Sequence, residues 1–390
     1  MIKNSSIRLI FFVALGFLLA TIQTAEATQA ANFNLCFNPD PSNNTYWPAN
    51  LVPQGSSAAP YCINQDAQAP ELVTNFEIDE FYAIQEVLRH IFPSASLTQT
   101  PTLNVSMQFD TSGENCEGSM TYVLSSNTIN SRYYNIPGAL ELLTTGVDPV
   151  GRNSNPFNAD ILLNCSINDL QTNFWLDPQP ADRNGPNAAE PAPADMSKAD
   201  FVSMQLHELL HGFGIMSGRD PSVGSYWYNN PPTLFDTLVV QYPDYYLTQN
   251  TAPTRYFWNT FAVDDHNQAF FEGPFTKAYL ASQTTNPAVS ALPGAPIASA
   301  GTMNALSSQN FSHIGIIIKP SQNDVDNPFD VDCGSTTYRT STYKIFGNDI
   351  MTMCYMPLFN HTYGIKNNRM NISLLDYAIL QDLGYTVDPS

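Results

Sequence analysis

Apolar side chains recur at helical spacing in two segments of the chain. In residues 76–92, FEIDEFYAIQEVLRHIF, this spacing predicts an amphipathic helix that ends at Pro93. Residues 371–385 show the same spacing, and Gly384 is expected to stop that helix. The pattern therefore predicts one helix in the N-terminal half of the chain and one at its C-terminal end.

Three shorter segments have the pattern of strands. Residues 103–109 alternate between apolar and polar side chains, as in a half-buried strand. Residues 120–124 and 159–166 are two further strand candidates. Residues 177–196 follow them, and their Pro, Asn and Ala content predicts a loop.

A third helix is expected over residues 197–214, directly after this loop. Ser197 and Asp200 stand three positions apart and resemble a capping box at the start of a helix. The predicted order of elements is therefore helix, strands, loop and helix.

The N-terminus predicts export of the protein. Residues 1–27 combine a positive start at Lys3 and Arg8, an apolar run over residues 9–20, and Ala25-Glu26-Ala27 as a cleavage site. This combination is typical of a signal peptide. No later run is long and apolar enough to cross a bilayer. We expect a secreted, extracellular protein, with the periplasm as the alternative location.

The composition fits this prediction and excludes some partners. The chain has 390 residues, enough for one large domain or two ordinary ones, and its 43% hydrophobic content can bury a core. The formal net charge of −20 argues against nucleic acid, whose phosphates attract clustered Lys and Arg. The same charge argues against adhesion to anionic membranes.

The cysteines predict disulfides. All six follow the expected cleavage site, which indicates three disulfides in an exported chain, and none forms a CxxC pair that would indicate a cysteine zinc site. We expect neighbours along the chain to pair, although about 15 pairings are open. The expected pairs are Cys36 with Cys62, Cys116 with Cys165, and Cys333 with Cys354. Residues 28–70 are expected to be an irregular, disulfide-tied segment, either a propeptide or part of the mature domain.

The third predicted helix carries a zinc motif, His207-Glu208-Leu209-Leu210-His211. Positions four apart face the same way on a helix, so His207 and His211 can aim ring nitrogens at one metal ion. Glu208 can reach a water molecule activated by that metal and take its proton during attack on a carbonyl. This arrangement suits the hydrolysis of peptide bonds.

A catalytic zinc needs three protein ligands and an open position, so a third ligand must come from elsewhere. Ser217, six residues after His211, is a poor ligand because a neutral hydroxyl binds zinc weakly. Glu272 is the only Glu after the motif, and it lacks helical ligand spacing around it. The remaining histidines are His90, His266, His313 and His361.

The stretch HELLHGFG, followed by FSHIG, NDIMT and LLDYAILQDLGYTVD, resembles the leishmanolysin-like branch of the metzincin metallopeptidases. In that branch a large insertion separates the glycine after the second histidine, here Gly214, from the third histidine. The resemblance implies that His313 is the third zinc ligand and that Met351 lies in a Met-turn beneath the ligands.

The resemblance also implies the architecture. We expect an α+β fold, with a mixed twisted sheet, an active-site helix and a mainly helical or irregular C-terminal subdomain. Residues 71–390 would be the metallopeptidase domain, with the insertion at about 215–312. The strand at 159–166 could line the substrate groove.

Alternatives stay open at several positions. His361 and His266 are the rival third ligands, and His313 could instead be a hydrogen-bonded histidine beside an apolar strand. Met351 could simply fill the core. Tyr355, just after the Met-turn, could help to stabilise an oxyanion.

These observations predict a secreted zinc endopeptidase with one zinc ion per chain and protein or peptide substrates. The alternative is a non-catalytic exported binding or adhesion protein on a metzincin-derived scaffold. An acidic loop could also bind calcium, but its spacing does not match an EF-hand, so a solvated loop is favoured. Its carboxylates are Asp324, Asp326, Asp330 and Asp332.

Overall fold

We describe the protein from a computed structural model. The structure describes residues 31–37, 61–65, 74–110, 116–149, 159–183, 198–220, 224–226, 231–243, 253, 256–261, 268–285, 290–297, 312–314, 351, 369 and 371–388. Within these residues, no helix has the length and apolar character needed to span a membrane.

A mixed five-stranded sheet forms the centre of the fold, in the order β2-β1-β4-β8-β5. Three neighbouring strands run parallel: β1 (Asn32–Phe37), β4 (Thr102–Asp110) and β8 (Ile161–Ser166). The flanking strands β2 (Tyr61–Asn64) and β5 (Cys116–Met120) are antiparallel to their neighbours. The expected α+β class and mixed sheet are therefore present.

The strands predicted at 103–109 and 159–166 are confirmed as β4 and β8. The strand predicted at 120–124 is divided, because Met120 ends β5 and a separate strand, β6 (Tyr122–Leu124), pairs with β7 (Asn135–Pro137). Periodicity alone does not reveal that Thr121 separates two strands of different sheets.

Two strands lie in the segment that the composition predicted to be irregular. In β1, Phe33, Leu35 and Phe37 are buried in the core. Cys36 of β1 stands opposite Cys62 of β2 and forms a disulfide with it. The apolar alternation in β1 covers only a few residues, so the surrounding Pro, Asn and Ala residues dominate the composition.

A second disulfide joins Cys116 of β5 to Cys165 of β8, which stand opposite each other in the ladder. Both described disulfides have the predicted partners. The third expected pair, Cys333 with Cys354, lies outside the described residues.

Helices α2 (Asn75–Leu88) and α5 (Phe201–Gly212) pack against each other, and α5 also contacts β5 and β8. The predicted helix at 76–92 ends earlier than expected, because Ile91–Phe92 forms strand β3, which pairs with β14 (Thr386–Val387). This pairing with the C-terminus is a tertiary contact that local spacing does not reveal.

The cap of α5 is Asp200, whose side chain accepts from the N–H of Ser203 at 3.0 Å. The predicted start at Ser197 is therefore too early, and Ser197 itself lies outside the described residues. Arg369 is bound to this cap, with its guanidinium 2.8 Å from carboxylates of Asp200 and Asp177. Arg369, from the C-terminal part of the chain, thus holds the start of the helix that carries His207, Glu208 and His211.

The segment after α5 contains regular structure of its own. Strands β11 (Val239–Tyr242), β12 (Gln268–Phe271) and β13 (Ala295–Ile297) form an antiparallel sheet. Helix α7 (Pro274–Ser282) packs on the C-terminal helix α10 (Leu374–Asp382). The part expected to be mainly helical or irregular therefore includes a sheet.

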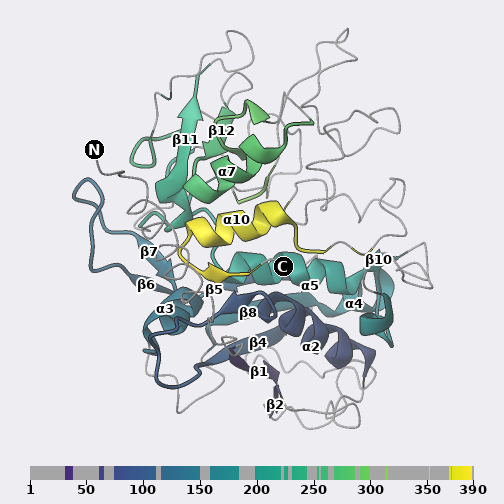
Figure 1. Cartoon of the computed structure of the whole chain (residues 1–390). Helices are drawn as coiled ribbons and strands as arrows, with labels where there is room; N and C mark the ends of the chain where they lie inside the picture. Colours follow the sequence, from purple (N-terminus) through teal and green to yellow (C-terminus); the bar gives the residue numbers. More distant parts are fainter. Residues whose placement is uncertain are drawn as a thin grey trace, which may run out of the picture.

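Figure 1 shows α5 crossing the middle of the molecule. The five-stranded sheet and α2 lie on one side of it, and α10, α7 and the β11–β12 strands lie on the other. The remaining short elements are α3 (Gly138–Thr145), α4 (Ile167–Thr172), β9 (Phe174–Trp175), η2 (Pro180–Arg183), β10 (Ala199–Asp200) and η3 (Phe235–Leu238). Helix α5 is thus enclosed by both halves of the fold.

Candidate metal centre

The motif His207-Glu208-Leu209-Leu210-His211 lies on a helix that is buried along its whole length. Every residue of α5 is buried, including His207, Glu208 and His211. Polar side chains are costly to bury unless they have partners, so these three need a polar or ionic neighbour. The two imidazoles lie on the same face of the helix, with ring centroids 4.7 Å apart.

His313 completes a group of three buried imidazoles. Its Nε2 lies 3.2 Å from Nε2 of His207, and its ring centroid lies 5.0 Å from that of His211. Each ring offers one nitrogen atom, and the three nitrogens lie within 4.8 Å of one another. Zinc–nitrogen bonds of about 2.0–2.1 Å in a tetrahedron place the nitrogens about 3.3 Å apart. The group could therefore hold a metal ion.

The turn after α5 orients His211. Gly214 has a φ of +103°, which favours glycine, and the turn brings the carbonyl oxygen of Ile215 back to the helix. Nδ1–H of His211 donates to this oxygen at 2.7 Å, so the lone pair is on Nε2. Burial lowers the pKa of His211 to about 4, and the bond to Ile215 opposes this shift. The ring is therefore neutral near pH 7, as a metal ligand must be.

Glu208 is held by β5, the last strand of the sheet among the described residues. Its Oε2 accepts a hydrogen bond from the backbone N–H of Gly118 at 2.5 Å. Burial raises the pKa of Glu208 to about 8, the Gly118 bond opposes this, and the charge of Glu117 adds to it. A divalent cation on the imidazoles would favour the carboxylate and lower this pKa.

The three histidines and Glu208 open onto a cleft of about 450 Å³. Gly118 and Ser119 of β5 line it, together with Met216. Leu163 and Asn164 of β8 also line the cleft, as expected for the strand at 159–166. Of the two strands, β5 is the one at the end of the described sheet. It contacts β8 on one side and α5 on the other.

No family model, curated protein or solved structure matches this chain. The interpretation of the site therefore depends on the residues themselves.

The structure brings Met351 to the segment of the third imidazole. Its carbonyl oxygen accepts a hydrogen bond from the N–H of Ile314 at 2.8 Å, and its side chain is fully buried. Ile314 directly follows His313. The methionine that the resemblance selects is thus joined to the chain beside the imidazole group.

Two other candidates lie away from the imidazole group. Glu272 accepts a hydrogen bond from Tyr242 and forms an ion pair of 2.6 Å with Lys277. Nδ1 of His90 lies 2.9 Å from the carbonyl oxygen of Asp388. Both side chains therefore have polar partners outside the imidazole group. The remaining candidates, His266, His361, Tyr355 and the acidic loop with Asp324, lie outside the described residues.

Two contributors to the site were not predicted from the sequence. Gly118 lies in CEGSM, which has no motif, and only its place on the edge strand brings it to Glu208. Ser217, which was rejected as a ligand, instead donates its N–H to Oγ of Ser312 at 2.9 Å. Both depend on contacts between distant segments, which no local signal predicts.

Proposed function

We propose that the chain is an exported, zinc-dependent endopeptidase. The observation that carries the proposal is the approach of His313 to His207 and His211 in a buried group open to a cleft. Three imidazoles with an open fourth position form a donor set typical of catalytic zinc. Glu208 on the same helix, and the resemblance to leishmanolysin-like peptidases, add support.

The chemistry assigned to the chain's own residues centres on Glu208. Zinc, when bound, supplies Lewis-acid activation of a water molecule and of the substrate carbonyl. Glu208 accepts the proton of the attacking water and then gives it to the leaving amine. Gly118 holds Oε2 of the carboxylate, so the other oxygen serves the proton transfer.

The cleft suits an extended peptide as substrate. Strand β5 forms one end of the described sheet, with β8 as its partner there. An edge strand can offer backbone N–H and C=O groups to an extended chain, which gives affinity without a narrow side-chain requirement. Protein and peptide substrates are therefore proposed.

Replacement of Glu208 by Gln tests this function. The variant is expected to fold and to bind one zinc ion per chain, but to lose cleavage of casein by about 10²–10⁴-fold, the usual contribution of a general base. The matched control is Glu272→Gln. It makes the same change at the only glutamate that follows the motif in the sequence, and it should cleave normally.

The same assay separates the two functions. Equal cleavage by the Glu208→Gln variant and the parent would contradict the assigned role of Glu208. Absence of cleavage in a zinc-loaded parent would favour the non-catalytic binding protein.

A further inference from the structure

The two ends of the long segment between the second and third histidines meet at one hydrogen bond. The backbone N–H of Ser217 donates to Oγ of Ser312 at 2.9 Å, across 95 positions of sequence. Both residues are buried. Ser312 directly precedes His313, so this bond fixes the backbone beside the third imidazole.

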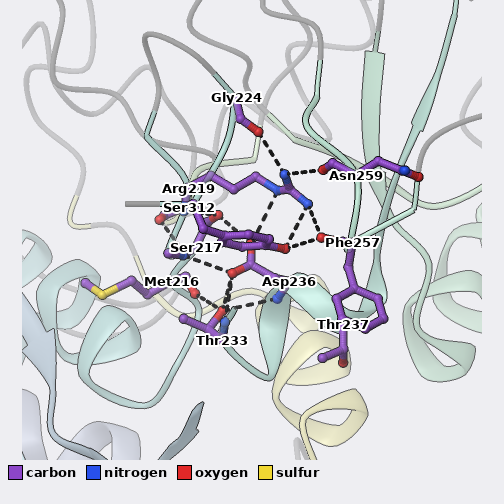
Figure 2. A network of polar contacts seen from close by, with 12 residues as sticks. Met216, Ser217, Arg219, Gly224, Thr233, Asp236, Thr237, Phe257, Asn259 and Ser312 are labelled. Carbon is purple, nitrogen blue, oxygen red and sulfur yellow. Dashed lines mark hydrogen bonds and ion pairs between the residues drawn. The ribbon is translucent and has the colours of Figure 1, made fainter. Parts of the chain in front are cut away.

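Asp236 of η3 lies beside this bond and is hydrogen-bonded to Ser217, as Figure 2 shows. Its Oδ1 accepts from the hydroxyl of Ser217 at 2.5 Å, and its Oδ2 accepts from the N–H of Gly218 at 3.0 Å. Thr233 adds its N–H at 2.9 Å and its hydroxyl at 3.0 Å. A fully buried carboxylate with donors on both oxygens has one orientation, so it fixes the position of Ser217.

Arg219 balances the charge of Asp236. Its Nε lies 3.8 Å from Oδ1 of Asp236, and both side chains are fully buried. The guanidinium donates to the carbonyl oxygens of Phe257 at 2.7 Å and Asn259 at 2.9 Å, and lies 3.6 Å from the centroid of the Phe261 ring. Figure 2 shows these bonds on the side of the network opposite Thr233. The ion pair is therefore hydrogen-bonded to Phe257 and Asn259, which lie in the segment between the second and third histidines.

We propose that Asp236 is a positioning residue for the third histidine. Asp236 orients Ser217, Ser217 holds Ser312, and Ser312 fixes the backbone from which His313 reaches His207. The inference rests on the proposed zinc site. His313 is far from α5 in the sequence, so no short turn fixes its position relative to His207 and His211. Non-covalent contacts must therefore hold its backbone in place.

Ser312→Ala tests the link with the smallest change. It removes the oxygen that accepts from Ser217 and alters no proposed ligand. We expect zinc affinity, measured by chelator competition on the purified full chain, to fall about 10–100-fold, as for other groups that orient ligands. The Co²⁺-loaded variant should also show a visible absorption spectrum different from that of the parent.

Asp236→Asn should weaken zinc binding in the same way. Hydrogen-bond donors reach both carboxylate oxygens, so the NH₂ group of Asn would face a donor in either orientation. The matched control is Ser373→Ala, which removes a hydroxyl that accepts backbone N–H groups at the start of α10. The control should lower the melting temperature without changing the zinc affinity or the Co²⁺ spectrum.

The outcomes separate this inference from the proposed function. If the parent binds zinc and both Ser312→Ala and Asp236→Asn bind it as tightly, the positioning role is wrong and the zinc site stands. If the parent binds no zinc, the proposed function and this inference both fail. Should Asp236→Asn not fold, the Ser312→Ala result alone decides.

Discussion

The backbone N–H of Gly118 and the side chain of Glu208 are joined by a hydrogen bond of 2.5 Å. The two residues also approach through their backbones, because a Cβ atom at position 118 would overlap the carbonyl group of Glu208. Strand β5 therefore lies against α5 as closely as glycine permits. The same contact sets the distance between β5 and α5 and the orientation of the Glu208 carboxylate.

Gly118→Ala is expected to impair catalysis more than metal binding. The added methyl group must push β5 away from α5, which lengthens the bond to Glu208. A displacement of about 1 Å costs about 10²-fold in activity. Peptide hydrolysis and zinc content of the same preparation measure the two effects.

Gly294→Ala is the control for this variant, because a Cβ atom there would overlap the carbonyl group of Phe271 on β12, outside the cleft. It should cleave at close to the parent rate. Full activity in Gly118→Ala would show that this close approach has no part in catalysis.

Glu80 predicts a dependence of stability on pH. It is fully buried on α2, and neither carboxyl oxygen has a hydrogen-bond partner in the described part of the chain. Burial raises the pKa of Glu80 well above its ordinary value. Between the unfolded and the folded pKa of Glu80, the folded state keeps its proton while the unfolded state loses it. The free energy of unfolding therefore falls as the pH rises through this range.

Glu80→Gln should accordingly raise the melting temperature at pH 7, by a few degrees. The gain should shrink towards pH 4, where the carboxyl of the parent is protonated in both states. Thermal unfolding followed by circular dichroism over this range measures it. The control on the same helix is Glu77→Gln, which weakens the capping box with Thr74 and should destabilise the protein. A Glu80→Gln variant less stable than the parent at pH 7 would contradict this account.

The sequence predicted the parts of the fold that depend on local pattern. Alternation of side chains located β4, and the i, i+4 spacing of His207 and His211 placed both rings on one face of α5. It misplaced the start of α5, because Ser197 and Asp200 have the spacing of a capping box, whereas in the structure Asp200 is itself the cap and accepts from Ser203.

The candidate site was predictable only in part, because its other half is assembled by distant contacts. His313 was selected by resemblance and not by spacing, and the structure brings it to His207 from 106 positions away. Gly118 lies in no motif, and no local pattern connected Asp236 with the third histidine. Their roles follow from the pairing of β5 and from the burial of a charge, which are properties of the folded chain.

The most direct test of the central claim is the zinc content of single histidine variants, measured by mass spectrometry after dialysis of the purified chain. We expect one zinc ion per chain in the parent and in the His266→Ala and His361→Ala variants, and little or none in His313→Ala. Full zinc in His313→Ala together with its loss in His361→Ala or His266→Ala would contradict it.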